Sequence, residues 1–359
     1  MSDMDLEMGL LYAVRAKASD IHLTAGVRPF FRIHGELVPW LDDRDGNRMT
    51  GSMIQEIAES LMTAQQFEAF LRQGGMDFSF VSPSAGRFRV SAYRQRGSTS
   101  LVFRPVPDDI PELEALGFSS TVPDLLNPDK LRGLILVTGA ASSGKSTTLA
   151  SIVHRINQTR AYHVITLEDP IEYLHTHAKS IVEQREIGHD AESMPVALRA
   201  CLRQDPDVIA LGSLDDLETA SLALIAAEMG YCVLAAMYSN SAVQAVESMI
   251  EMFPGSQKDR IRLQLALSLR AVITQQLLPG ADGQGRIMAH EILVGSPAVR
   301  NLIRDNKLHQ IQTVLETSPR WGMQSMDMSL AFLVRSQKIS SDTALWHALD
   351  KDHLQRLLG

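Results

Sequence analysis

Apolar and polar residues alternate along the first hundred residues in the pattern of an antiparallel sheet with helices packed on it. Apolar stripes with helical spacing predict one helix from Leu6 to Lys17 and another from Ser52 to Gln73, with Thr50 or Ser52 as its cap. A hairpin that turns at His34-Gly35 is also indicated. The predicted strands are 30–33, 36–38, 77–81, 86–93 and 98–104.

Beyond residue 130, apolar strands alternate with helices. The predicted segments are 133–138, 146–158, 162–167, 193–203, 207–212, 216–229 and 231–237. Such alternation is typical of a largely parallel sheet covered by helices on both faces. From about residue 240 the pattern is mostly helical, with one strand at 286–294.

The chain of 359 residues exceeds the usual size of one domain. The stretch Pro105–Pro111 is polar and rich in proline, which makes it the best linker candidate. We therefore predict an α/β protein with a small first domain at 1–104, a linker at 105–120 and a larger second domain at 121–359.

Composition narrows the class of protein. A formal net charge of −8 argues against nucleic acid as the main partner. The only cysteines, Cys201 and Cys232, lie in apolar segments and are expected to be buried free thiols in a reducing compartment. The longest apolar stretch, 220–237, is interrupted by Glu228 and Gly230, which favours a helix and a strand over a membrane span. The acidic N-terminus does not resemble a signal peptide, so a cytoplasmic location is expected.

Residues 139–146, here called the phosphate-binding loop, fit the pattern G-x-x-x-x-G-K-[ST] between a predicted strand and a predicted helix. This context favours a real site over a chance match. Backbone N–H groups and the positive end of the helix would hold the phosphates of ATP. Lys145 would reach the outer phosphates and Ser146 would bind Mg²⁺. The other candidate phosphate-binding residues here are Gly139, Ser142, Ser143, Gly144 and Thr147.

Hydrolysis needs acidic groups at the ends of neighbouring strands. Glu168 and Asp169 end one strand and suit magnesium, although they could also be a solvated strand end. The strand 208–211 instead runs into Gly212-Ser213, where a hydrolase would present an acid. A serine hydroxyl is a poor base at neutral pH.

Asp215 and Asp216 lie just beyond this strand end. Their position two residues further along changes the reach and direction of the side chains. We expect them to cap the following helix rather than to replace the missing acid.

Several blocks together resemble the PilT/PilU-type retraction ATPases of type IV pili, within the secretion ATPase superfamily. The last block is similar to the A-I-R-N-L-I-R signature of retraction motors. The matching blocks are 86–90, 133–139, 165–172, 184–188, 197–207, 216–219 and 298–304.

The resemblance implies a PAS-like N-terminal domain and a RecA-like P-loop domain with a helical C-terminal region. It also implies ATP and Mg²⁺ as cofactors, and a homo-hexamer or a mixed ring with a paralogous motor subunit. The ring would act on the inner-membrane platform protein of the pilus from the cytoplasm, without inserting into the membrane or binding nucleic acid. Glu168, Arg199 and Arg203 become candidate catalytic residues. Arginines with a possible role in nucleotide binding are Arg94, Arg96 and Arg104; each arginine could instead form a surface ion pair.

The departures from the family pattern concern hydrolysis. Ser213 stands where the family has glutamate, and Tyr238 stands where it has the histidine of a Thr-Leu-His-Thr motif. The loop also has Ala140 and Ser142 in place of the usual proline and glycine. The favoured hypothesis is an ATP-binding retraction motor subunit with weakened hydrolysis. The alternatives are a fully active motor and, more remotely, a RecA-like nucleic-acid translocase.

Overall fold

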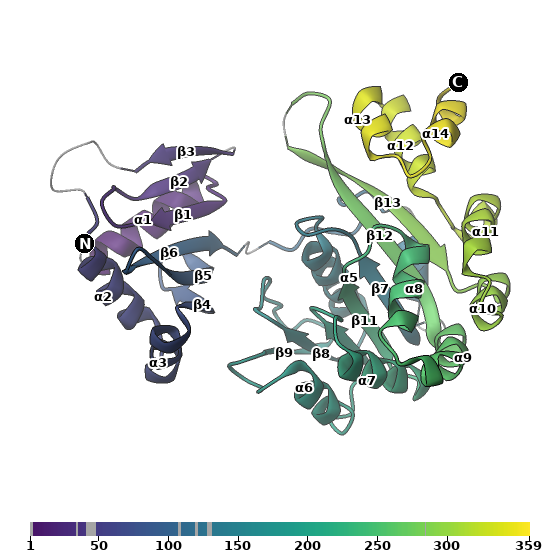
Figure 1. The fold of residues 1–359 in the computed structure, drawn as a ribbon, viewed down its shortest axis with the longest axis horizontal. Helices are drawn as coiled ribbons and strands as arrows, with labels where there is room; N and C mark the ends of the chain where they lie inside the picture. The colour runs from purple at the N-terminus through teal and green to yellow at the C-terminus, as the bar shows by residue number, and fades with distance from the viewer. Residues whose placement is uncertain are drawn as a thin grey trace. The chain divides into compact units, whose positions relative to one another are not determined.

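The computed structural model describes residues 3–33, 35–40, 48–106, 109–118, 121–127, 131–283 and 285–359. The chain forms two compact units (Figure 1): residues 1–109 with Pro170–Leu174, and residues 110–169 with 175–359. Parts of the predicted linker and of the predicted turn at His34 lie outside the described residues. Leu113 and Phe118, inside the predicted linker, are buried in the core of the second unit.

The first unit contains a six-stranded antiparallel sheet in the order β3-β2-β1-β6-β5-β4. Its core is built from alternate strand residues, including Phe31, Phe88 and Phe103, which pack with apolar residues of the helices. The predicted strands are all present. The strands are β1 (Asp20–Leu23), β2 (Phe30–Ile33), β3 (Glu36–Pro39), β4 (Gly75–Ser82), β5 (Gly86–Gln95) and β6 (Ser98–Pro105), and the first helix is α1 (Asp3–Arg15).

The predicted single helix from Ser52 to Gln73 is wrong, because it is two helices, α2 (Gly51–Leu61) and α3 (Ala64–Gln73). Thr63 begins the second helix. Its hydroxyl accepts from the N–H of Gln66, and its own N–H donates to the Gln66 side chain. The apolar stripe continues through this capping box, so the hydrophobic pattern alone does not reveal the break. The Thr50 cap of α2 is confirmed.

The second unit contains a seven-stranded sheet in the order β13-β12-β7-β11-β10-β8-β9. Its strand pairs are parallel except for β12 with β13. Two strands were not predicted: β9, at the edge of the sheet, and β12, which follows helix α9 without a break. The strands are β7 (Gly133–Thr138), β8 (His163–Glu168), β9 (Ile181–Glu186), β10 (Val208–Leu211), β11 (Cys232–Met237), β12 (Leu269–Pro279) and β13 (Arg286–Val294).

Alternate residues of β7 face two separate cores. Leu134 and Leu136 pack with residues of α6 to α11, whereas Ile135 and Val137 pack with α4 and α5. This is the two-sided coverage predicted for a parallel sheet. Cys201 and Cys232 are buried free thiols, as predicted, and burial raises the pKa of Cys232 to about 12. The helices are α4 (Thr121–Leu125), α5 (Lys145–Thr159), α6 (Met194–Cys201), α7 (Leu217–Glu228), α8 (Ala242–Glu251), α9 (Lys258–Ser268), α10 (Pro297–Arg304) and α11 (Ile311–Thr317).

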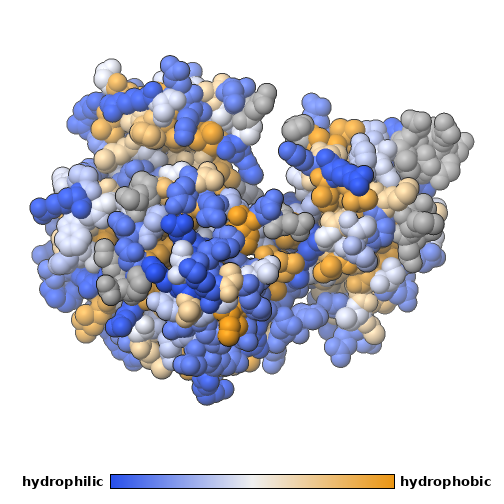
Figure 2. Space-filling model, turned by 180° about the vertical axis from the view of Figure 1, so that it is seen from behind, coloured by the Kyte–Doolittle hydropathy of each residue, from blue (hydrophilic) through white to orange (hydrophobic). Residues whose placement is uncertain are grey.

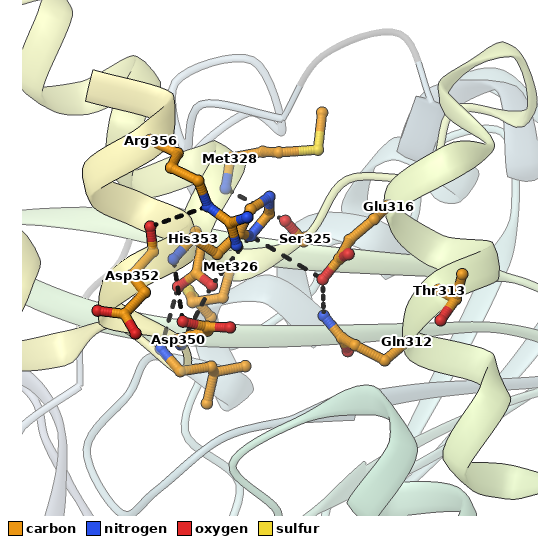
Figure 3. Close-up of polar contacts among 12 residues, drawn as sticks. Gln312, Thr313, Glu316, Ser325, Met326, Met328, Asp350, Asp352, His353 and Arg356 are labelled. Carbon is orange, nitrogen blue, oxygen red and sulfur yellow. Dashed lines mark hydrogen bonds and ion pairs between the residues drawn. The ribbon is translucent and has the colours of Figure 1, made fainter. Parts of the chain in front are cut away.

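Three further helices, α12 (Met326–Arg335), α13 (Ser341–His347) and α14 (Lys351–Leu358), complete the C-terminal region. Buried Asp327 accepts hydrogen bonds from the N–H groups of Leu349 and Asp350. His353 of α14 points toward Glu316 of α11 (Figure 3), and its Nδ1 lies 3.5 Å from Asp327 Oδ2. Burial raises the pKa of Asp327 despite these hydrogen bonds. The carboxylate thus joins α12 to the start of α14.

Hydrophilic residues cover most of the face seen in Figure 2, with apolar residues scattered between them in small groups. Across the described ranges, none of the helices combines the length and the apolar character needed to span a bilayer.

Candidate nucleotide-binding site

The phosphate-binding loop begins where β7 ends, between the ends of β11 and β12. Thr138 is in register with Met237 on one side and with Thr274 on the other. Gly139 has φ 154°, and a Cβ atom there would lie 2.3 Å from Ser143 Oγ and 2.5 Å from the carbonyl oxygen of Gln275. A side chain at this position would therefore force the loop to move. Gly144 (φ 91°) then leads into α5.

Lys145 lies over its own loop. Its Nζ donates to the carbonyl oxygens of Gly139 (3.1 Å) and Ala140 (2.8 Å). The same Nζ lies 4.2 Å from the centroid of the Tyr238 ring. Tyr238 is the first residue after β11, so the register of β11 and β7 puts it beside the loop.

Gln275 of β12 supports the loop from inside the protein. Its side chain is fully buried, and its Nε2 donates to the carbonyl oxygen of Ser143 at 2.8 Å. The adjacent Thr274 hydroxyl bonds to that of Thr138 at 2.8 Å. The role of Gln275 was not predicted from the sequence. The available signal was a pair of polar residues, Thr274 and Gln275, within an apolar run.

Glu168 ends β8, three strands away from β7, which corresponds to about 14 Å between the strand axes. Its Oε1 accepts hydrogen bonds from Thr166 Oγ1 (2.6 Å) and Gln184 Nε2 (3.0 Å). Two donors on one oxygen fix the direction of this carboxylate. Asp169, the other predicted magnesium ligand, is exposed.

Gly212-Ser213 follows β10 directly beside Glu168. A Cβ atom on Gly212 would lie 3.2 Å from the Cα atom of Glu168, so the two strand ends are closely packed. Ser213 is half-buried. Asp216 caps α7, as predicted, by accepting from the N–H of Thr219 at 2.9 Å. Asp215 is exposed. The side chain that follows β10 beside Glu168 is thus the uncharged hydroxyl of Ser213.

The five candidate arginines are distributed over both units. Arg199 of α6 forms an ion pair with Glu218 at 2.6 Å, and Arg203 is exposed just after this helix. Arg94, Arg96 and Arg104 belong to the first unit, where Arg94 and Arg96 are exposed at the β5–β6 turn.

Arg104 donates two hydrogen bonds to Oδ1 of Asp20, at 3.0 and 2.8 Å. Burial by itself would raise the pKa of Asp20, but the hydrogen bonds from Arg104 and Ser19 outweigh it and the pKa is lowered. Arg104 and Arg199 therefore each have a carboxylate partner within their own unit.

The family model described as Type II/IV secretion system protein matches residues 4–331 of the chain. The chain belongs to this family. It is 39% identical to the type IV pilus retraction ATPase PilT of Pseudomonas aeruginosa, over 95% of this chain and 97% of PilT. It is 36% identical to the type IV pilus ATPase PilU of the same organism, over 99% of this chain and 91% of PilU.

Among solved structures, that of the pilus retraction motor PilT with bound ADP matches with a TM-score of 0.89 and 41% identity, over 98% of this chain and 99% of that chain. The PilT/PilU-type resemblance read from the sequence is confirmed, and so is the α/β fold class with an N-terminal domain and a RecA-like ATPase domain.

Proposed function

We propose that this protein is an ATP-binding subunit of a ring-forming type IV pilus retraction motor whose hydrolytic step is weakened. The names and the extent of similarity of the PilT and PilU relatives support the motor assignment. The observation that carries the second part is the contrast between an intact phosphate-binding loop and the uncharged Ser213 at the end of β10.

The loop geometry fits a nucleotide. Gly139 and Gly144 allow a compact turn before α5, whose first N–H groups attract phosphate. Lys145, with Ser142, Ser143 and Thr147 around it, would bind the phosphates of ATP. Ser146, Glu168 and Asp169 would hold Mg²⁺, directly or through water, and the metal would neutralise charge on the phosphates.

The weakened step is water activation. Glu168 is the remaining candidate for ordering a water, and it is held by Thr166 and Gln184. Loss of a positioned general base costs typically about 10²–10⁴-fold in rate. The arginines Arg94, Arg96, Arg104, Arg199 and Arg203 remain candidates for contacts with the phosphates. For Arg104 and Arg199 this would require exchange of the present carboxylate partner.

The proposed assembly is a hexamer of this chain or a mixed ring with a paralogous motor subunit, working in the cytoplasm on the inner-membrane platform protein of a pilus. The domains proposed for this subunit are 1–104 and 121–359, joined by the segment 105–120, whose Leu113 and Phe118 pack in the core of the second unit. A fully active motor is the second candidate function, and the well-oriented carboxylate of Glu168 favours it.

The deciding experiment measures ATP binding by calorimetry and steady-state phosphate release on the same purified protein. We expect micromolar binding with little or no turnover. Phosphate release at the rate of active family members would refute weakened hydrolysis.

Lys145→Ala provides the control for the site. Removing a charged partner of the phosphates costs about 2–5 kcal/mol, so binding should fall by at least about thirtyfold. Undiminished binding in this variant would show that the nucleotide binds elsewhere.

A further inference from the structure

The ammonium group of Lys145 is held on three sides by this chain. Two carbonyl oxygens of the loop accept hydrogen bonds from it, and the Tyr238 ring lies 4.2 Å away. Tyr238 is otherwise an exposed aromatic residue, with 62% of its surface accessible. A lysine ammonium over the face of a tyrosine is attracted by the negative charge of the ring face.

We propose that Tyr238 is a positioning residue that keeps Lys145 folded onto the phosphate-binding loop and so opposes nucleotide binding. The inference rests on the proposed function, because it concerns the same site. The register of the sheet supports it: Met237 pairs with Thr138, so the residues that follow, Tyr238 and Gly139, leave adjacent strands side by side.

Phosphate and ring compete for the same ammonium group. To bind a phosphate, Nζ must turn from the two carbonyl oxygens and from the ring toward the ligand. A cation–π contact at an exposed site is strong enough to change an affinity by about twofold to fivefold. Tyr238 thus gives the ammonium group of Lys145 an attractive contact that nucleotide binding would have to replace.

The first test measures ADP affinity by calorimetry, because ADP binding is independent of hydrolysis. Tyr238→Leu should bind ADP about twofold to fivefold more tightly than the unchanged protein. Tyr238→Phe, which keeps the ring, should match the unchanged protein. Phe332→Leu is the control for loss of an exposed aromatic ring, since Phe332 is 65% exposed on α12, and it should have no effect.

The second test needs no nucleotide. The protein is acetylated with an amine-reactive ester, and the rate of modification of Lys145 is measured by peptide mass spectrometry. Tyr238→Leu should raise this rate by about twofold or more, and Tyr238→Phe should not.

The inference is overturned if Tyr238→Leu leaves the acetylation rate unchanged, lowers the ADP affinity, or behaves like Tyr238→Phe. If no variant binds ADP, the proposed function fails, but the acetylation rates still decide whether Tyr238 restrains the lysine.

Discussion

The ends of β7 and β10 lie at the same edge of one sheet, yet they differ in the side chains that they offer to a nucleotide. The end of β7 leads into a loop with two glycines at positive φ and a lysine, and buried Gln275 of β12 lies beneath this loop. The end of β10 has Gly212-Ser213, which offers only a hydroxyl. In the proposed function, phosphate binding and water activation therefore depend on different strands, and one could change without the other.

The largest expected effect on the rate of phosphate release comes from placing an acidic residue at the end of β10. Ser213→Glu should raise steady-state phosphate release by about a hundredfold or more, because a positioned base contributes typically about 10²–10⁴. Ser213→Gln has similar size without the charge and should give no increase. If the glutamate variant also gives none, Tyr238 or the arginines limit the reaction as well.

Lowering the pH should reduce the stability of the sheet as a whole, and so affect the ends of β7 and β10 together, because both strands belong to that sheet. Burial lowers the pKa of His290 on β13 to about 4, below its ordinary value of about 6.5. Between these values the unfolded chain binds the proton and the folded chain does not, so stability is present above pH 6.5 and is lost as the pH falls toward 4.

Between pH 7 and pH 5, the free energy of unfolding should fall by about 2 kcal/mol because of His290. Chemical denaturation at the two pH values measures it, and His290→Gln should show a smaller pH dependence. His175, whose pKa burial and His154 also lower to about 4, acts in the same direction and remains in that variant. An unchanged pH dependence in His290→Gln would contradict the assignment.

A smaller effect is expected under the phosphate-binding loop. Gln275→Leu leaves the carbonyl of Ser143 without its side-chain donor, so ADP affinity should fall by about tenfold. The matched control is Gln276→Leu, whose side chain contacts His347 of α13 instead. An equal loss of affinity in both variants would mean that β12 as a whole, rather than Gln275, supports the loop.

The sequence was sufficient for features set by local pattern. The loop at 139–146, its strand and its helix follow from a motif and its flanking periodicity, and the Asp216 cap follows from residue type. The periodicity does not predict the role of Gln275, because β12 follows α9 without a break and only the polar pair Thr274-Gln275 marks the position. The contact between Tyr238 and Lys145 depends on the pairing of β7 with β11, which brings together residues 93 positions apart.

One strand, β12, links the phosphate-binding loop to the C-terminal helices. Gln275 holds the loop, and the next residue, Gln276, contacts His347 of α13. Consecutive side chains of a strand point to opposite faces, and pairing with β7 and β13 keeps the strand stiff. β12 is therefore a shared support, and a substitution that shifts this strand would disturb the phosphate-binding loop on one face of the sheet and α13 on the other.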